Sequence, residues 1–349
     1  MTERYDDAGL TATTSELFTK AGLDTPIAAA VAEILVEADL LGYSTHGLQF
    51  VPAYVANIEA GYTTTSGDPE VAGDNGAALV LDGNWLPGQW VMLRALDLAF
   101  DRINAHPLVG VALRRCHNIS CLATYAKRAA DRGLFAIVAA AAPGNAAVAP
   151  HGGRAPRLST SPFAVGIPGD PHPILIDTST SSVSNRRIER TRRAGERLPE
   201  PWLVDNTGHP TDDPEAFYSD PPGAILPAGG VDLGHKGFAW SLLIESLASG
   251  LAGFGRGQPG AAGNTVWLQL IDPAAFAGTE ALQRQTGDLA ELCRDTPPLA
   301  GGDPVRIPGD RAYAAYAEQS AQGITLHPEI LPRLRPLLEK YGVAEPAPL

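Results

Sequence analysis

The chain has 349 residues, of which 44% are hydrophobic and 19% charged, and its formal net charge is −13. These values are typical of a globular protein with a large core, and the acidic balance argues against nucleic acid as a partner. No apolar run reaches the roughly 18 residues of a membrane span, and the N-terminus lacks a signal-peptide pattern, so we expect a cytoplasmic protein with no membrane partner. The three cysteines lack paired metal-ligand spacing, so we expect no metal site.

The first 65 residues are predicted to be helical. Thr25, followed by proline, is typical of an N-cap and first helical turn. Apolar residues then recur at helical spacing as far as Ala38, and Gly42 is a natural stop. A second apolar stripe starts after Gly47 and ends at Gly61. We therefore expect two helices joined by a short corner.

The corner carries the run YSTHG, in which His46 precedes the second helix. A helix N-terminus presents unpaired N–H groups and partial positive charge, which favour anions and a neutral imidazole. A histidine held there can donate or accept a proton near neutral pH. The alternative interpretation is a histidine that only caps the corner.

Six short apolar runs have the length and β-branching of buried strands. Helical stripes separate some of them, which predicts an α/β sheet core. Between Gly195 and Gly234 the chain is rich in Pro, Gly and Asp, and a long excursion of this kind is often functional. Helices are then predicted over 238–251, opened by Lys236 and Gly237, and over 328–341. The six strand runs are 78–81, 109–113, 135–138, 163–167, 174–176 and 266–271.

No glycine-rich dinucleotide fingerprint follows a predicted strand. The one glycine ladder, residues 253–257, follows a helix and is predicted to be a loop. The hydroxyl-rich stretch 177–181 can cradle a pyrophosphate or can be a polar strand end. The arginines between 186 and 193 suit a phosphate or a solvated helix face. A dinucleotide cofactor, if bound, must be held without a Rossmann motif.

Eight blocks along roughly residues 8 to 343 resemble, in the same order, the malate/L-lactate dehydrogenase type 2 family. This family comprises NAD(P)-dependent oxidoreductases, including 2-hydroxyacid dehydrogenases, ketimine reductases and diketogulonate reductase. The resemblance implies a non-Rossmann, mixed-sheet α/β fold with a helical N-terminal part. The blocks are 38–61, 149–153, 159–162, 176–181, 199–208, 226–230, 235–237 and 308–311.

The resemblance also implies an organisation and an assembly. Residues 1–70 are expected to form a helical part that carries the catalytic histidine and is joined by the C-terminal helix within 312–349. Residues 71–311 are expected to form the α/β cofactor-binding domain. A homodimer is implied, with its active site between subunits, and the apolar faces of the N-terminal helices are candidate interface surfaces.

Roles for individual residues follow from the same resemblance. His46 is expected to be the proton donor in reduction, with Thr45 orienting it and Tyr54 lining the pocket, and the cofactor is NADPH or NADH. The residues expected to contact this cofactor are Asp177, Ser179, Thr180, Ser181, His235, Lys236, Gly309 and Asp310.

Three departures from the family pattern affect the substrate. Phe50 stands where the family carries an arginine for the substrate carboxylate, Asn118 stands at the second histidine position with His117 one place earlier, and a Gly-Lys pair is replaced by Arg186-Arg187. We expect Phe50, His117 and Asn118 at the substrate. We therefore predict reduction of a C=O or C=N group in a specialised small molecule other than malate. The alternative is a non-redox acid–base enzyme, such as a dehydratase or isomerase, on the same fold.

Overall fold

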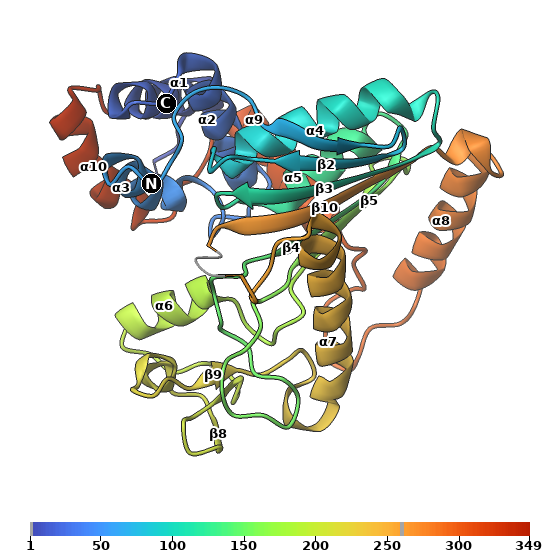
Figure 1. Ribbon diagram of the computed structural model, residues 1–349. Helices are drawn as coiled ribbons and strands as arrows, with labels where there is room; N and C mark the ends of the chain where they lie inside the picture. Colours follow the sequence, from blue (N-terminus) through green and yellow to red (C-terminus); the bar gives the residue numbers. More distant parts are fainter. Residues whose placement is uncertain (1–2, 259–261) are drawn as a thin grey trace.

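The computed structural model describes residues 3–258 and 262–349, and its N-terminal part is helical as predicted. The elements of this part are α1 (Asp7–Ala21), α2 (Thr25–Leu40), the 3-10 helix η1 (Leu48–Phe50), α3 (Val51–Glu59) and α10 (Ile330–Tyr341). Although α10 comes from the end of the chain, it packs against α1 and α3 (Figure 1). The first and last segments also pair directly, because the Leu349 N–H donates to the Arg4 carbonyl at 2.8 Å.

A seven-stranded mixed sheet lies at the centre of the molecule, in the order β1-β2-β3-β10-β4-β5-β6. Its strands are β1 (Glu70–Asp74), β2 (Ala78–Asp82), β3 (Leu108–Cys116), β4 (Phe135–Ala141), β5 (Phe163–Ile167), β6 (Ile174–Thr178) and β10 (Asn264–Ile271). Among these described strands β2 and β3 pair in parallel, and the other neighbours are antiparallel. This is not the parallel dinucleotide-binding order, so the prediction of a non-Rossmann α/β fold is confirmed.

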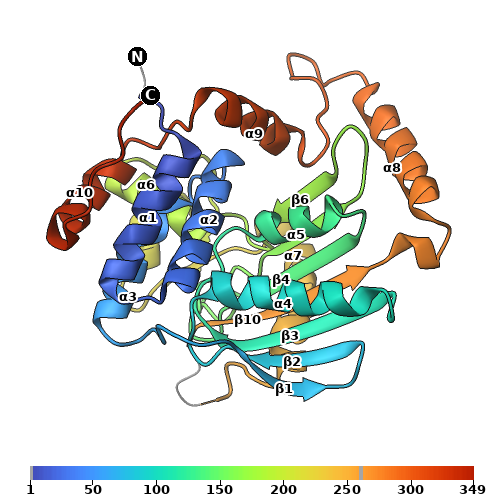
Figure 2. The same cartoon turned by 90° about the horizontal axis from the view of Figure 1, so that it is seen from above.

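Helices cover both faces of this sheet. One face carries α4 (Gly88–Ile103) and α5 (Leu122–Ala130), and the other carries α7 (Gly230–Glu245) with the π-helix η3 (Ser246–Gly250) that continues it (Figures 1 and 2). The central strands therefore bury side chains on both faces, as their continuous apolar runs predict. Val111, Val138 and Leu268 are fully buried there.

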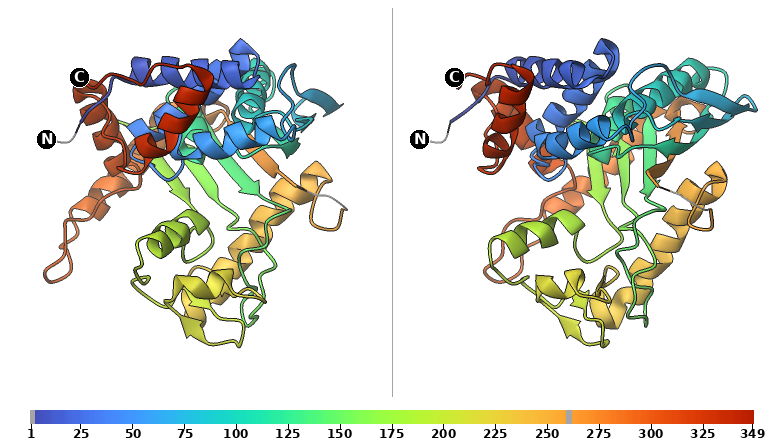
Figure 3. Two further views of the ribbon diagram at one scale, coloured as in Figure 1. Left: turned by 90° about the vertical axis from the view of Figure 1, so that its left-hand side faces the viewer. Right: turned by 60° about the vertical axis from the view of Figure 1, so that its left-hand side comes forward.

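The Pro-, Gly- and Asp-rich excursion is ordered and has a small core of its own. It follows α6 (Asn185–Arg193) and contains a three-stranded sheet, in which Leu203 and Ile225 are fully buried. Figure 3 shows this unit on the same side of the central sheet as α7. Its elements are β7 (Leu203–Val204), β8 (Pro210–Thr211), the 3-10 helix η2 (Pro214–Tyr218) and β9 (Ala224–Ile225).

Two predicted helix starts are wrong. The N-cap of α2 is Asp24, so Thr25 is already helical. The larger error concerns α7, which begins at Gly230 behind Gly229 and so includes Lys236 within the helix. The glycines made this stretch look like a loop, but they serve the turn and the packing: Gly229 has a φ of +96°, and a Cβ on Gly237 would lie 2.5 Å from the backbone of Ala228.

The remaining helices lie towards the C-terminal end. They are the 3-10 helix η4 (Pro273–Ala275), α8 (Thr279–Arg294) and α9 (Asp310–Gln322). Figure 1 shows α8 projecting from one edge of the molecule, whereas α9 packs against α2. None of the described helices has the length and apolar character needed to cross a lipid bilayer.

Candidate active site

A cavity of about 780 Å³ lies where the α2–η1 corner, the β3–α5 loop, the end of β6 and the start of α6 meet. This volume falls in the range typical of ligand and cofactor sites. Side chains at its wall that carry polar or aromatic groups include Thr45, His46, Phe50, His117, Asn118, Ser120, Asp177, Ser179, Asn185, Arg186 and Glu189.

His46 lies on the wall of this cavity and is fixed by its neighbours. Its Nδ1 is 2.9 Å from the Thr45 hydroxyl, and its backbone carbonyl accepts a hydrogen bond from the Ser120 hydroxyl. Burial, reinforced by the positive charge of Arg186, lowers the pKa of His46 to about 4. The imidazole is therefore neutral near pH 7, and within residues 3–258 and 262–349 the ring forms a hydrogen bond through Nδ1 alone.

A buried carboxyl group explains why the corner takes this shape. Asp39, at the end of α2, is 4% exposed, and its Oδ2 accepts a hydrogen bond from the Leu48 N–H at 2.8 Å. A Cβ on Gly47 would lie 2.2 Å from that same oxygen, so only glycine fits beside it. Burial raises the pKa of Asp39 to about 7, against the lowering effect of the Leu48 N–H. This role of Asp39 was not predicted, although an acidic residue on the buried side of an apolar helical stripe is a signal for it.

Phe50, at the position of the missing arginine, forms a buried aromatic platform. It is 6% exposed. Its ring stacks on Tyr54 with 5.4 Å between centroids, and His46 approaches it edge-on at 5.8 Å. The Arg186 guanidinium lies 4.8 Å from the centre of the same ring, within range of a cation–π interaction. The platform thus links the histidine to a cation from α6.

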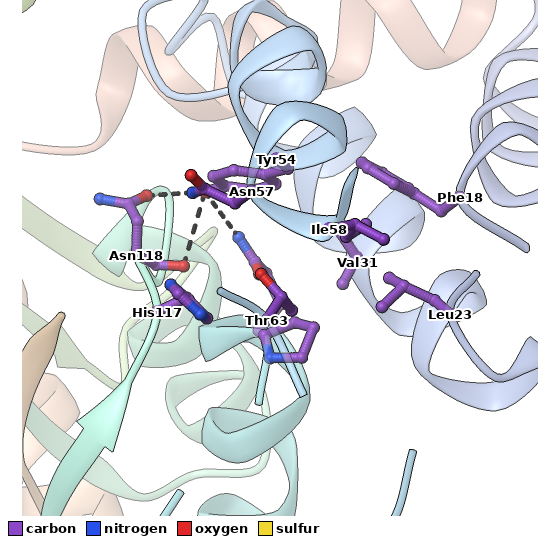
Figure 4. Close-up of a pocket in the computed structure, with 11 residues that line it drawn as sticks. Phe18, Leu23, Val31, Tyr54, Asn57, Ile58, Thr63, His117 and Asn118 are labelled. Atoms are coloured by element: carbon purple, nitrogen blue, oxygen red, sulfur yellow. Dashed lines mark hydrogen bonds between the residues drawn. The ribbon is translucent and has the colours of Figure 1, made fainter. Parts of the chain in front are cut away.

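Tyr54 lies beside a smaller pocket of about 40 Å³, away from the wall of the main cavity. Figure 4 shows it extending from α3 towards Asn118. Its hydroxyl donates to Asn118 Oδ1 at 2.7 Å and accepts from Gln89 Nε2 at 3.0 Å. The same Asn118 oxygen accepts the Ser120 N–H at 2.9 Å. These bonds hold the β3–α5 loop against the helical part.

His117 also reaches the cavity, but one ring nitrogen is already engaged. Its Nε2 is 3.0 Å from the Tyr62 carbonyl, to which it donates. Burial lowers the pKa of His117, although this hydrogen bond raises it. His117 and Asn118 therefore lie with Phe50 and His46 around the same cavity.

The hydroxyl-rich stretch after β6 divides into two parts. Asp177 and Ser179 line the cavity. Asp177 Oδ2 accepts the Ala123 N–H at the start of α5 at 2.8 Å, and burial raises the pKa of this carboxyl to about 6. Thr180 and Ser181 are buried behind them: Thr180 Oγ1 is 2.8 Å from the Ser241 hydroxyl of α7, and Ser181 donates to a nearby carbonyl.

Four residues expected at the cofactor lie outside the cavity of this single chain. His235 and Lys236 are exposed on α7, with the His235 ring 5.7 Å from that of His151. Gly309 is the N-cap of α9 and Asp310 is its first residue, whose carboxylate pairs with Arg294 at 2.8 Å. One protomer therefore brings the histidine, the substrate candidates and the β6 end together, and leaves these four residues on other surfaces.

The chain is similar to known proteins over most of its length. The sequence profile described as malate/L-lactate dehydrogenase matches residues 6–335. An L-lactate dehydrogenase from Cupriavidus necator is 34% identical, with 92% of this chain and 93% of the relative covered. A Delta(1)-pyrroline-2-carboxylate/Delta(1)-piperideine-2-carboxylate reductase from Pseudomonas syringae pv. tomato is 32% identical, with 92% of each covered.

A solved structure supports the same assignment. The malate dehydrogenase of Entamoeba histolytica superposes with a TM-score of 0.92 at 25% identity, covering 99% of this chain and 100% of that one. The fold and the profile match together agree with the resemblance seen in the sequence blocks. The chain therefore belongs to the malate/L-lactate dehydrogenase family, and it is an enzyme of the dehydrogenase and reductase class.

Proposed function

We propose that this enzyme uses NADH or NADPH to reduce a C=O or C=N group of a specialised small molecule other than malate, with His46 as the proton donor. One observation carries the proposal: a neutral, oriented His46 shares the wall of a cavity of about 780 Å³ with the polar end of β6. Its relatives include an L-lactate dehydrogenase and reductases of cyclic imino carboxylates.

The residues at the cavity fit a nicotinamide nucleotide. The volume of the cavity suits a ligand of this size. Asp177 and Ser179 offer hydrogen-bonding groups for a ribose and a pyrophosphate. When bound, the nucleotide supplies the hydride, and the protein orients the reacting carbon and manages the proton. The proton donor in reduction is the protonated His46 ring, because a neutral imidazole cannot lose its remaining N–H proton near pH 7. Since Nδ1 lies 2.9 Å from the Thr45 hydroxyl, we expect the ring to take up a proton on Nε2 and to transfer it from there.

Lys236→Ala is expected to weaken NADH or NADPH binding by about 1.5–3 kcal/mol, the value of one charge-assisted hydrogen bond. Fluorescence titration of each nucleotide against the purified protein measures this. Lys340→Ala, which removes an exposed lysine paired with Glu59, serves as the matched control. Unchanged affinity in Lys236→Ala would remove Lys236 from the site. If the native protein binds neither nucleotide, the non-redox acid–base alternative replaces the proposal.

We infer that the enzyme works as a homodimer. The apolar faces of α1 and α2, which the sequence offers as an interface, are instead packed inside the chain, and Phe18 and Ile34 are fully buried. By contrast, α7 exposes several large apolar side chains around Lys236, a pattern that marks an interaction surface. A partner seated on α7 would also bring Lys236 towards a second subunit. The exposed residues are Val231, Leu233, Trp240, Leu242 and Leu243.

Leu243→Glu is expected to convert the dimer to a monomer, because it places a charge in the apolar surface of α7. Light scattering at micromolar concentration measures the mass of each form. Leu108→Glu is the control, since Leu108 and Leu243 are both 45% exposed but Leu108 begins β3. A monomeric wild type would contradict the dimer.

A further inference from the structure

We propose that Arg186 binds the carboxylate of the substrate, in place of the arginine that the family carries at position 50. This inference rests on the proposed function and deepens it, because it assigns the substrate to the 2-oxo or cyclic 2-imino carboxylates. Arg186 comes from α6, lines the main cavity, and lies 4.8 Å from the Phe50 ring centre, while His46 contacts the same ring.

The Phe50–Tyr54 aromatic platform explains how an arginine from α6 can take the place of the arginine at position 50. A phenyl ring cannot bind a carboxylate, but its face attracts a guanidinium. Because Phe50 is buried and stacked on Tyr54, the face offered to Arg186 is fixed in place. The positive charge thus stays near position 50 although the arginine side chain starts on another element.

Glu189 fixes the position of the Arg186 guanidinium without neutralising the local positive charge. Its Nη1 donates to Glu189 Oε2 at 2.7 Å, and Glu189 also pairs with Arg193 at 2.6 Å. The three side chains therefore keep one net positive charge. Across residues 3–258 and 262–349, the hydrogen bonds of Arg186 involve Nη1 alone, so its other N–H groups are available for a bidentate carboxylate contact.

The position of the anchor also limits the substrate. A carboxylate on Arg186 places the adjoining carbon near the Phe50 ring and His46, which is the order of groups in a 2-oxo or 2-imino acid. The buried aromatic wall favours an apolar or cyclic body over the second charged group of malate.

The test uses pyrrole-2-carboxylate and pyrrole-2-carboxamide, planar probes that differ in charge and cannot be reduced by hydride transfer to a C=N bond. Calorimetric titration of the full-length protein loaded with NADPH or NADH gives both affinities. We expect the wild type to prefer the carboxylate, and Arg186→Ala to weaken carboxylate binding by about 10- to 100-fold with carboxamide and nucleotide binding unchanged. Arg186→Lys should recover part of the loss, because it keeps the charge but not the fork.

The control is Arg197→Ala, which removes an exposed arginine paired with Asp212 outside the cavity and should change neither affinity. Equal carboxylate affinity in wild type and Arg186→Ala overturns the inference, as does a wild type that does not prefer the carboxylate. An equal loss of both probes in Arg186→Ala also overturns it, since the residue would then only shape the cavity. Failure of the wild type to bind either nucleotide counts instead against the proposed function.

Discussion

His46→Ala is expected to lower turnover by about 10²–10⁴-fold while leaving nucleotide affinity nearly intact, because general acid–base catalysis contributes a factor of that size. The ring is oriented by Thr45 and lies at the cavity wall, so its loss removes a positioned proton donor and little binding surface. Steady-state kinetics, with fluorescence titration of NADH and NADPH, separate the two effects.

His117→Ala is the matched control and should reduce turnover less, because the Nε2–H group of His117 already donates a hydrogen bond to the Tyr62 carbonyl. If His117 proves essential and His46 dispensable, the proton donor lies on the β3–α5 loop. The pH profile gives a second check. Oxidation uses neutral His46 as a base, and with a pKa of about 4 that base is lost only in acid. The kcat/KM for oxidation should therefore show no His46 ionisation between about pH 6 and pH 8.

Gly47→Ala is expected to lower the free energy of unfolding by about 1–3 kcal/mol, the range for an overpacked buried site. The new Cβ would lie 2.2–2.5 Å from the carboxyl atoms of the buried Asp39. The φ of Gly47, −99°, lies outside the left-handed region that favours glycine, so the prediction rests on this steric contact. Denaturant unfolding measures it.

Two further variants sharpen this measurement. Asp39→Ala removes the atoms in the way, so the double variant should lose less stability than the two single losses combined. Gly287→Ala lies within α8 with no atom near its Cβ position and should stabilise by about 0.5–1 kcal/mol. If Gly47→Ala unfolds like the wild type, the Asp39 contact does not shape the corner.

Much of the fold could be predicted because its signals are local. The six buried strands are continuous apolar runs, and all six are present in the central sheet. β1 escaped prediction because Glu70–Asp74 is a polar, mostly exposed edge strand. The strands of the small sheet have two residues each, too few for any periodicity. The predicted start of α7 is eight residues too late, at 238 against Gly230, because the glycines of this stretch are typical of a loop.

The site divides in the same way. The His46 corner could be predicted from glycines and apolar stripes close to it in the chain. The contact between Phe50 and Arg186 could not, because six strands of the central sheet lie between η1 and α6 in the chain and no sequence pattern encodes the pair. The placement of Lys236 on an exposed face of α7 likewise depends on tertiary packing, and its role in cofactor binding stays a prediction.

Hydride transfer between a nicotinamide nucleotide and a small molecule at the His46 cavity is the reaction that we propose for this enzyme. It is tested most directly by following NADH and NADPH oxidation by absorbance with a panel of bulky 2-oxo acids and cyclic 2-imino carboxylates, beside pyruvate and oxaloacetate. We predict oxidation of at least one nucleotide with a member of the first two groups, faster than with oxaloacetate and nearly abolished in His46→Ala. Absence of oxidation with every substrate, or undiminished oxidation in His46→Ala, would contradict the account.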